Sequence, residues 1–322
     1  MSYQSIRELV AADMASVDVL MRDRLSSDVA LINQLSSHII GSGGKRLRPL
    51  IVLLSARACG YDGDRHPLLA AIIELIHTAT LLHDDVVDDS RLRRGRTTAN
   101  AQFGNAAAVL VGDFVYSRAF QMMTELHSPR IMDVLAECTN TIAAGEVMQL
   151  INCHDATATE AHYMEIIYCK TAKLFEAGER LSAVIAGESP SIEQGLADYG
   201  KHLGIAFQLI DDVLDYRADS GKTGKNVGDD LAEGKPTLPL IRAMRVGSRQ
   251  QAAAVRSAIE SGGLERLDAV LEAIESTHAI AYTAERAKQQ AQQAIEALDP
   301  LPPSQYRQGL KALAQFSVRR NH

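Results

Sequence analysis

Apolar residues recur every three or four positions along almost the whole chain, and runs that alternate between apolar and polar residues are nearly absent. This pattern predicts helices rather than strands. Clusters of Gly, Pro, Asp and Ser supply the turn chemistry that ends each helix. The predicted helices cover residues 4–24, 27–41, 46–59, 66–89, 104–127, 129–153, 159–187, 191–217, 236–246, 249–261, 264–297 and 303–319.

The sequence shows no sign of a boundary between domains. No repeat, low-complexity tract or long linker separates the chain into parts. The simplest prediction is a single large all-α domain that spans residues 1–322. The last part, 248–322, is amphipathic and rich in Ala, Gln, Glu and Arg, which is typical of a packing surface or a subunit contact.

Composition narrows the class of protein. Hydrophobic residues make up 46% of the 322 positions, which is enough for a substantial core. The formal net charge of −7 leaves no basic excess to neutralise the phosphates of a nucleic acid, so we expect no nucleic-acid partner. The four cysteines lack metal-binding spacing and are predicted to be reduced, buried thiols: Cys59, Cys138, Cys153 and Cys169.

The location of the protein is predicted from its apolar stretches. The first ten residues include Arg7 and Glu8 and no apolar segment of the kind found in a signal peptide. The longest apolar run, 68–82, contains Glu74 and His77 and is too short to span a bilayer. We therefore expect a cytoplasmic protein with no integral membrane segment.

Two copies of one acidic motif, DDxxD, occur at 84–88 and 211–215. Each copy follows an apolar helical segment, so each is predicted to lie at the C-terminal end of a helix. The first and last aspartates of a copy share one helix face, whereas the middle aspartate is turned about 100° away. Carboxylates stacked in this way repel each other and the negative end of the helix dipole.

This repulsion indicates that a cation binds here. A single acidic helix end is more often an ordinary solvated surface, but two copies after two apolar helices make that explanation weaker. Oxygen ligands without His or Cys favour Mg²⁺, which binds carboxylates together with water and substrate phosphates. The sequence therefore predicts Mg²⁺ at the two acidic motifs.

Basic residues lie on both sides of the first acidic motif in the sequence. The loop GGKRLRP at 43–49 combines flexible glycines with Lys45, Arg46 and Arg48, a composition suited to binding an oxyanion. The run RLRRGR follows the first acidic motif at 91–96. Any one basic run is more often a solvated face. Together with the acids, these runs predict two diphosphates, one held through Mg²⁺ and the other held directly by cations.

Five motifs in this order resemble the trans-isoprenyl diphosphate synthases, particularly the long-chain enzymes of the octaprenyl or solanesyl type. The resemblance covers almost the full length and is carried by GGKRLRP at 43–49, ELIHTATLLHDDVVDDSRLRRGRTT at 74–98, KTAKLFEA at 170–177, FQLIDDVLDY at 207–216 and GKNVGDDLAEGKPTLPL at 224–240. It implies an all-helical isoprenoid synthase fold around a deep central cavity, and an active homodimer. It also implies Mg²⁺-dependent, repeated condensation of isopentenyl diphosphate onto an allylic diphosphate to build a long polyprenyl diphosphate for a quinone side chain.

The resemblance also assigns roles to individual residues. The aspartates that would hold Mg²⁺ against the allylic diphosphate are Asp84, Asp85, Asp88, Asp211, Asp212 and Asp215. The other residues implied for that diphosphate are Arg93, Lys170, Lys225 and Lys235. Those implied for isopentenyl diphosphate are Lys45, Arg48, His77 and Arg94. The oxygen atoms of Thr171 and Gln208 would stabilise the developing carbocation, whereas Asp89, Asp229 and Asp230 are as compatible with solvent or supporting roles as with metal binding.

Product length is predicted from small residues near the first acidic motif. Ala79 and Thr80 lie about one turn before Asp84 on the predicted helix 66–89. In short-chain relatives aromatic residues at this place stop the growing chain, so the resemblance implies a deeper tunnel here. Met123 on the next helix is the candidate for its floor, although a methionine at such a position is also typical of an ordinary core.

Two other functions fit parts of the sequence. A terpene cyclase shares the fold and the first acidic motif, but it has no need of the GGKRLRP loop and typically carries a different second motif. A non-catalytic subunit of a heteromeric synthase could lose its aspartates, whereas both DDxxD copies are intact here. Neither alternative accounts for the full set of motifs.

Overall fold

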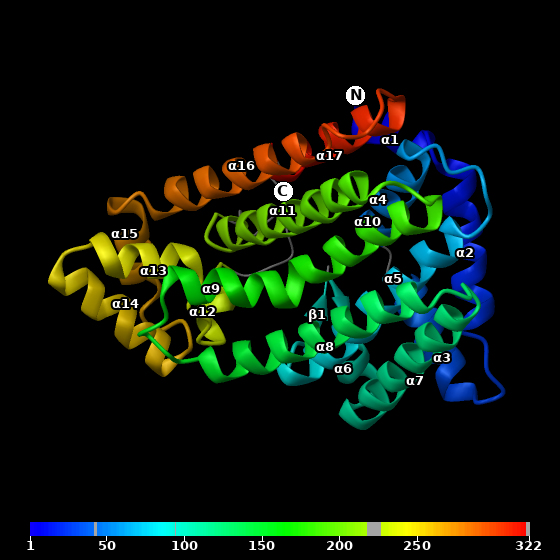
Figure 1. Cartoon of the computed structure of the whole chain (residues 1–322). Helices are drawn as coiled ribbons and strands as arrows, with labels where there is room; N and C mark the ends of the chain where they lie inside the picture. The colour runs from blue at the N-terminus through cyan, green and yellow to red at the C-terminus, as the bar shows by residue number, and fades with distance from the viewer. Residues whose placement is uncertain (42–43, 94, 218–226, 320–322) are drawn as a thin grey trace. The chain divides into compact units, whose positions relative to one another are not determined.

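The structure, a computed structural model, describes residues 1–41, 44–93, 95–217 and 227–319 (Figure 1). Within these ranges the regular secondary structure is helical except for one short antiparallel pair of strands, so the predicted all-α class is confirmed. The chain divides into two compact units, each built from three stretches. Unit 1 comprises 1–139, 174–200 and 297–313, and unit 2 comprises 140–173, 201–296 and 314–322. The single domain over 1–322 stays a prediction.

Unit 1 is built around the apolar helix α5 (His66–Val87). Helices α2 (Ala11–Arg24), α4 (Leu47–Ala58) and α7 (Asn105–Thr124) pack against it (Figure 1). Its apolar side chains are buried over most of its length. Among the described residues, α5 is also the one helix long and apolar enough to cross a membrane, but 72% of its apolar window is buried inside the protein. Burial on this scale is typical of a core helix. The remaining helices with residues in unit 1 are α1 (Tyr3–Glu8), α3 (Ala30–Gly41), α6 (Ala99–Phe103), α8 (Pro129–Asn152), α10 (Lys173–Ala186), α11 (Pro190–Asp215) and α17 (Gln305–Arg319).

Unit 2 has two hydrophobic clusters. One lies among α13 (Leu238–Val246), α14 (Arg249–Ser261) and α15 (Leu267–Ser276). The other joins α9 (Glu160–Ile167) to apolar residues of α11 and includes the buried Tyr163 and Leu209. The unit also contains a π-helical turn, η1 (Tyr168–Ala172), and the helices α12 (Asp229–Ala232) and α16 (Ala279–Ala297).

Two predicted long helices are interrupted, and the sequence has no Gly or Pro at either break. The predicted helix 4–24 is wrong in this respect, because the chain turns at Leu9 and Val10 between α1 and α2. The predicted helix 264–297 divides into α15 and α16, where His278 has a φ of 53°. The hydroxyl of Thr277 donates to the carbonyl oxygen of Ala273 at 2.6 Å there. The backbone N–H of Thr277 bonds to the same oxygen, so Thr277 caps α15, and the left-handed His278 turns the chain away from the helix axis.

Two further departures lie next to the predicted site. The predicted helix 159–187 contains η1 between α9 and α10, so its backbone widens over five residues. After α5, strands β1 (Leu92–Arg93) and β2 (Arg96–Thr97) form a hairpin in which Leu92 pairs with Thr97 and Arg93 pairs with Arg96. Two-residue strands are too short to produce an alternating pattern, so the sequence did not predict them.

Candidate active site

The first acidic motif lies at the end of α5, as its sequence position predicted. The helix ends at Val87, and the N–H of the C-cap residue Asp88 bonds to the carbonyl oxygen of Asp84 at 2.8 Å. The last turn of this fully described helix contains no basic residue. The negative end of the α5 dipole and the aspartates therefore coincide, which favours a cation at this place.

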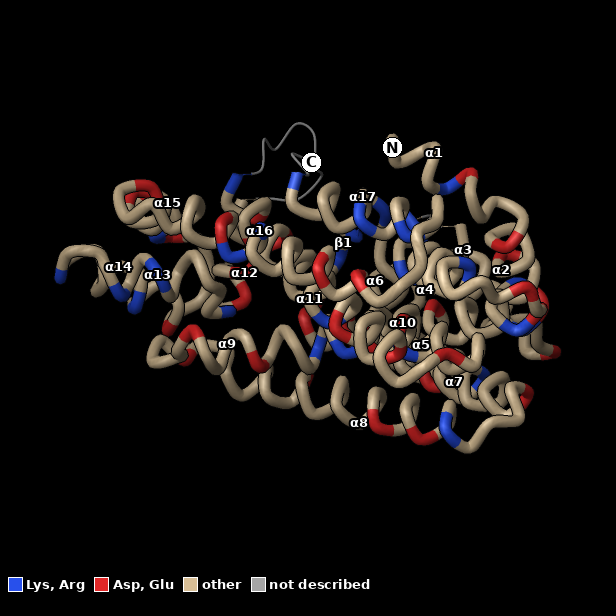
Figure 2. The backbone as a smooth tube through the Cα atoms, turned by 45° about the horizontal axis from the view of Figure 1, so that its top comes forward, with Lys and Arg blue, Asp and Glu red and all other residues tan. Residues whose placement is uncertain are grey.

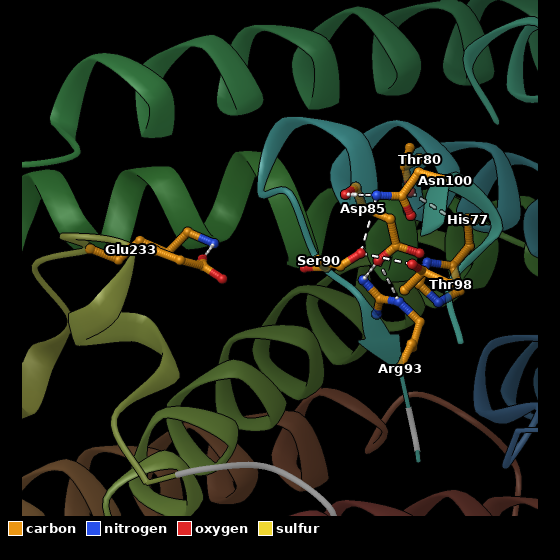
Figure 3. Close-up of polar contacts among 9 residues, drawn as sticks. His77, Thr80, Asp85, Ser90, Arg93, Thr98, Asn100 and Glu233 are labelled. Atoms are coloured by element: carbon orange, nitrogen blue, oxygen red, sulfur yellow. Dashed lines mark hydrogen bonds and ion pairs between the residues drawn. The ribbon is translucent and has the colours of Figure 1, made fainter. Parts of the chain in front are cut away.

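Arg93 is held against this motif by an ion pair with Asp85. Its Nε and Nη2 atoms donate to Oδ1 of the buried Asp85 at 2.9 and 2.7 Å (Figure 3). The amide of Asn100 donates to the carbonyl oxygens of Asp85 and Ser90 at 2.9 and 3.1 Å. The hydroxyl of Thr98 donates to the same oxygen of Ser90 at 2.7 Å. These bonds fold the β1–β2 hairpin onto the end of α5 and place a cation beside the acids.

The predicted cations of the GGKRLRP loop lie at the start of α4. Arg48 Nη1 lies 2.9 Å from Nε2 of His77 on α5. Because a guanidinium only donates, Nε2 accepts, and the proton of the neutral ring is on Nδ1. The Arg48 guanidinium also lies 4.5 Å from the ring centroid of Phe175, a cation–π contact. The carbonyl oxygen of Lys45 accepts a bond from the Tyr3 hydroxyl at 3.0 Å.

A cavity of about 80 Å³ in unit 1 is lined by Asp85 and Arg93 and by His77, the partner of Arg48. Its lining residues come from α3, from α5, from the β1–β2 hairpin and from the loop that precedes α4. The charged and polar lining residues include Arg46, Glu74, His77, Asp85 and Arg93. The structure therefore brings the predicted isopentenyl-binding residue His77 close to residues that were predicted for the allylic diphosphate.

The second acidic motif ends α11 and lies in unit 2. Asp212 and Asp215 are almost fully buried. Gln208, one turn earlier, donates from Nε2 to Asp212 Oδ1 at 2.9 Å, and its own Oε1 accepts from the Thr171 hydroxyl at 3.0 Å. The hydroxyl of Tyr163 donates to the other oxygen of Asp212. Three predicted residues, Thr171, Gln208 and Asp212, thus form one chain of hydrogen bonds, and Tyr163 is an additional member.

The pKa values of the residues around Asp212 are shifted because several acidic groups lie close together there. Burial, together with the negative charges of Asp230 and Asp211, raises the pKa of Asp212 to about 8. Burial also raises the pKa of Tyr163 well above its ordinary value, with a further contribution from the neighbouring Asp212. Each of these carboxylates thus makes ionisation of the others less favourable, and a bound cation would relieve that repulsion.

Two predicted lysines of unit 2 have carboxylate partners. Lys170, in the π-helical turn η1, lies with its Nζ 2.5 Å from Oε2 of Glu146 on α8. Lys235 forms an ion pair with Glu233. Lys225 and Arg94, which were also predicted to bind diphosphate, lie outside the described residues.

The donor chemistry of the two acidic motifs fits Mg²⁺. Within the described residues, no three His, Cys, Asp or Glu side chains gather into a ready-made metal site. Mg²⁺ keeps several waters and usually takes one or two carboxylates together with substrate phosphate oxygens, so it needs no complete protein cage. The oxygen-only donors and the mutual repulsion around Asp212 match these preferences.

The residues predicted to set product length lie on α5 and α7 of unit 1. Ala79 and Met123 are fully buried. The Thr80 hydroxyl donates to the carbonyl oxygen of His77 at 2.9 Å, within its own helix. Their role in product length stays a prediction.

Several residues at the site were missed by reasoning from sequence. The partners of predicted residues are Asn100, Tyr163, Glu146 and Glu233. Glu74 was within a quoted motif but had received no role, and it pairs with Arg46. Each of these residues bonds to a predicted site residue that folding brings near it. Only Glu233 also lies close to its partner in the sequence.

Comparison with known proteins agrees with this arrangement. The sequence matches the family model of polyprenyl synthetase over residues 29–276. It is 55% identical to octaprenyl diphosphate synthase of Escherichia coli (strain K12) over 322 residues, which is 100% of both chains. It is 45% identical to all-trans-nonaprenyl-diphosphate synthase (geranyl-diphosphate specific) of Rhodobacter capsulatus, with 98% of each chain covered.

A solved structure gives the same result. The fold matches, with a TM-score of 0.95 and 44% sequence identity, a polyprenyl synthase from Caulobacter crescentus CB15 complexed with calcium and isoprenyl diphosphate. The match covers 100% of this chain and 98% of that one. With its all-helical fold and two acidic helix ends, the chain belongs to the polyprenyl synthetase family and is a prenyltransferase.

Proposed function

We propose that this prenyltransferase extends an allylic diphosphate, such as farnesyl diphosphate, by successive condensations with isopentenyl diphosphate. Its product is a polyprenyl diphosphate of octaprenyl or nonaprenyl length for a quinone side chain. The observation that carries the proposal is the cavity of unit 1, where His77 of one predicted diphosphate site lies with Asp85 and Arg93 of the other. Full-length identity of 55% to an octaprenyl diphosphate synthase supports the long product.

The two diphosphates are held by different means. Lys45, Arg48 and His77 bind isopentenyl diphosphate through cationic and hydrogen-bond donors, together with Arg94. The contact between Arg48 and His77 at 2.9 Å supports a shared role for these two side chains.

The allylic diphosphate is the leaving group, and its negative charge must be stabilised as the C–O bond breaks. The cationic groups for this are Arg93, Lys170, Lys225 and Lys235. Mg²⁺ bound by the aspartates of both motifs would neutralise further charge on the same diphosphate. The aspartates proposed to hold it are Asp84, Asp85, Asp88, Asp211, Asp212 and Asp215.

The allylic cation needs partial negative charge and protection from water. The hydroxyl oxygen of Thr171 and the amide oxygen of Gln208 provide such dipoles, and their bond to each other at 3.0 Å supports a fixed orientation. The double bond of isopentenyl diphosphate attacks the cation and forms the new C–C bond. Loss of a proton then regenerates a double bond, with the released diphosphate as the base.

The enzyme works as a cytoplasmic homodimer in this proposal. A terpene cyclase and a non-catalytic partner subunit are the alternatives, and neither explains both intact DDxxD copies together with the GGKRLRP loop. Activity of the purified chain by itself would exclude a dependence on a second kind of subunit.

The direct test is product analysis. The purified chain is incubated with Mg²⁺, farnesyl diphosphate and labelled isopentenyl diphosphate, and the dephosphorylated products are sized by chromatography. We expect a series that ends at octaprenyl or nonaprenyl length. Absence of label in any product, with the protein folded, would contradict the proposal.

The aspartates are tested separately by Asp84→Ala and Asp211→Ala. Each change removes a proposed Mg²⁺ ligand from a helix end, so we expect turnover to fall by at least about a hundredfold while the fold is retained. Steady-state kinetics and circular dichroism measure the two effects. Rates near the wild-type value in either variant would refute the role of that motif in binding Mg²⁺.

A further inference from the structure

Arg46 has an unusual backbone for the residue that begins a helix. It is the N-cap of α4, with φ 47° and ψ 42°, and its side chain makes no capping bond. The left-handed conformation is unfavourable for any residue with a Cβ, so the turn needs other contacts to hold it. The two neighbouring cations, Lys45 and Arg48, are the ones proposed to bind isopentenyl diphosphate.

An ion pair with α5 provides such a contact. Arg46 Nη1 lies 3.0 Å from Oε1 of Glu74, and the two side chains are only 18% and 11% exposed. The same nitrogen lies 3.4 Å from the sulfur of Met21. The Arg46 side chain is thus directed at α5 and α2, and its charge is compensated by Glu74.

A parallel contact follows two residues later. Arg48 bonds to His77, and Glu74 and His77 are three residues apart on α5, so they share a helix face. Two arginines of one turn are therefore tied to one face of one helix. The bond from Tyr3 to the carbonyl oxygen of Lys45 restrains the same turn from a third direction.

We propose that Glu74 is a positioning residue for isopentenyl diphosphate, because its ion pair with Arg46 holds the left-handed turn that orients Lys45 and Arg48. The inference rests on the proposed function, in which these two cations bind that substrate. When only a fraction of the molecules has the competent turn, the apparent dissociation constant rises in inverse proportion to that fraction. Loss of the ion pair should therefore weaken substrate binding without removing a group that touches the substrate.

The test measures the dissociation constant of isopentenyl diphosphate by calorimetry, together with KM and kcat. For Glu74→Gln we expect the dissociation constant and the KM for isopentenyl diphosphate to rise about tenfold, with kcat within about twofold of the wild type. Arg46→Gly should weaken binding similarly, although glycine adopts the left-handed turn freely. Unchanged binding in a folded Glu74→Gln variant would overturn the inference.

A matched control lies at the other end of α4. Arg57 forms a bidentate ion pair with Asp13 at 2.7 and 2.9 Å, and this pair is also largely buried. Asp13→Asn should lower the melting temperature by breaking a buried pair, as Glu74→Gln does, but should leave binding unchanged. Equal weakening of binding in both variants would overturn the inference, since it would reflect general destabilisation.

A double variant distinguishes the orientation of the turn at residue 46 from the overall stability of the protein. In Arg46→Met combined with Glu74→Leu, apolar packing replaces the buried ion pair and should restore the melting temperature. We expect binding to stay weak, because apolar packing is not directional and does not hold the turn in the orientation that the ion pair imposes. Restored binding would overturn the inference. Lys45→Ala serves as the reference for the proposed function: wild-type binding in that variant would refute the substrate site itself, whereas weak binding there with normal binding in Glu74→Gln would refute only the role of Glu74.

Discussion

At the scale of single residues, the second acidic motif depends on neighbours that are distant in sequence. The carboxylate of Asp212 is buried and accepts hydrogen bonds from Gln208 on its own helix and from Tyr163, 49 residues earlier. The two donors fix the orientation of both carboxylate oxygens. A carboxylate held in this way needs little rearrangement when it binds a cation.

Tyr163→Phe tests this orientation. The change removes one donor to Asp212 and keeps the buried ring, so we expect kcat to fall about tenfold. We also expect a loss of stability of about 1–3 kcal/mol, because a buried carboxyl oxygen loses its donor. A Mg²⁺ titration of the same variant should require a higher concentration for half-maximal activity.

The matched control is Tyr282→Phe in the same unit. The Tyr282 hydroxyl donates to both carboxylate oxygens of Glu160 at 2.9 and 2.8 Å, at residues with no proposed catalytic role. We expect wild-type kinetics for the control. The same kinetics in Tyr163→Phe would show that Tyr163 does not orient a catalytic group.

At the scale of elements, the π-helical turn η1 is the feature that places Lys170 and Thr171. Short π turns inside helices often occur at functional sites. The turn lies directly against Gly145 of α8. A Cβ added to Gly145 would be only 2.8 Å from the backbone nitrogen of Lys170 and from the Cβ of Cys169. Only glycine allows this approach, so Gly145 is predicted to be essential for the position of η1.

Gly145→Ala should displace η1. The added methyl group meets backbone rather than a flexible side chain, so we expect a destabilisation of about 1–3 kcal/mol. A fall in kcat should accompany it, because Lys170 and Thr171 move with the turn. Thermal unfolding and steady-state kinetics measure both.

Gly309→Ala in α17 is the control for this change. The nearest atoms to its added Cβ lie at 3.5 and 3.6 Å, which is ordinary van der Waals contact. We expect wild-type activity in the control. If Gly145→Ala behaves in the same way as the control, the close approach of α8 has no functional importance.

The packing of α5 against α7 provides a second prediction at this scale. Ala79→Tyr introduces a large ring at a fully buried position on α5. If the growing chain passes this position, the ring should stop elongation at about three or four isoprene units, at a cost to stability of about 1–3 kcal/mol. Chromatographic sizing measures the product, and Ala79→Ser serves as the small control. A folded Ala79→Tyr enzyme that makes the long product would contradict the tunnel.

At the scale of the whole molecule, acidic and basic residues are interspersed along the chain (Figure 2). Glu179 on α10 is fully buried, and its carboxyl group accepts a bond from the Ser55 hydroxyl. Burial raises its pKa to about 8 from an ordinary value of 4.5. The folded protein therefore keeps a proton on Glu179 at a pH where the unfolded chain has lost it.

This difference makes stability dependent on pH. Between the unfolded value of 4.5 and the folded value of about 8, the folded state binds more protons, so the free energy of unfolding falls as pH rises. The contribution is fully present below the lower value and is lost through the upper one. Its slope is at most about 1.4 kcal/mol per pH unit.

Glu179→Gln should remove this contribution. The amide has the same shape and is neutral at every pH, so the variant should gain stability relative to the wild type as pH rises through the same window. Denaturant unfolding at a series of pH values measures the difference. Parallel curves for the two proteins would contradict the buried, protonated state of Glu179.

The features that depend on local spacing could be predicted from the sequence. The helical periodicity of α5 and α11 and the aspartates at their ends follow from residues within a few turns of one another. For the same reason the predicted helix 249–261 agrees with α14 at both ends. The motifs are also local, so their order along the chain was sufficient to indicate the family.

Which side chains contact one another depends on the packing of the helices and could not be predicted from the sequence. The partners Tyr163 for Asp212, Glu146 for Lys170 and Glu74 for Arg46 come from other elements, and no sequence period relates them. The π turn and the left-handed Arg46 are likewise imposed by packing against α8 and α5, because each conformation is unfavourable in isolation. Helices are specified by local preference, whereas the side-chain contacts that tune a catalytic site are specified by how the helices pack.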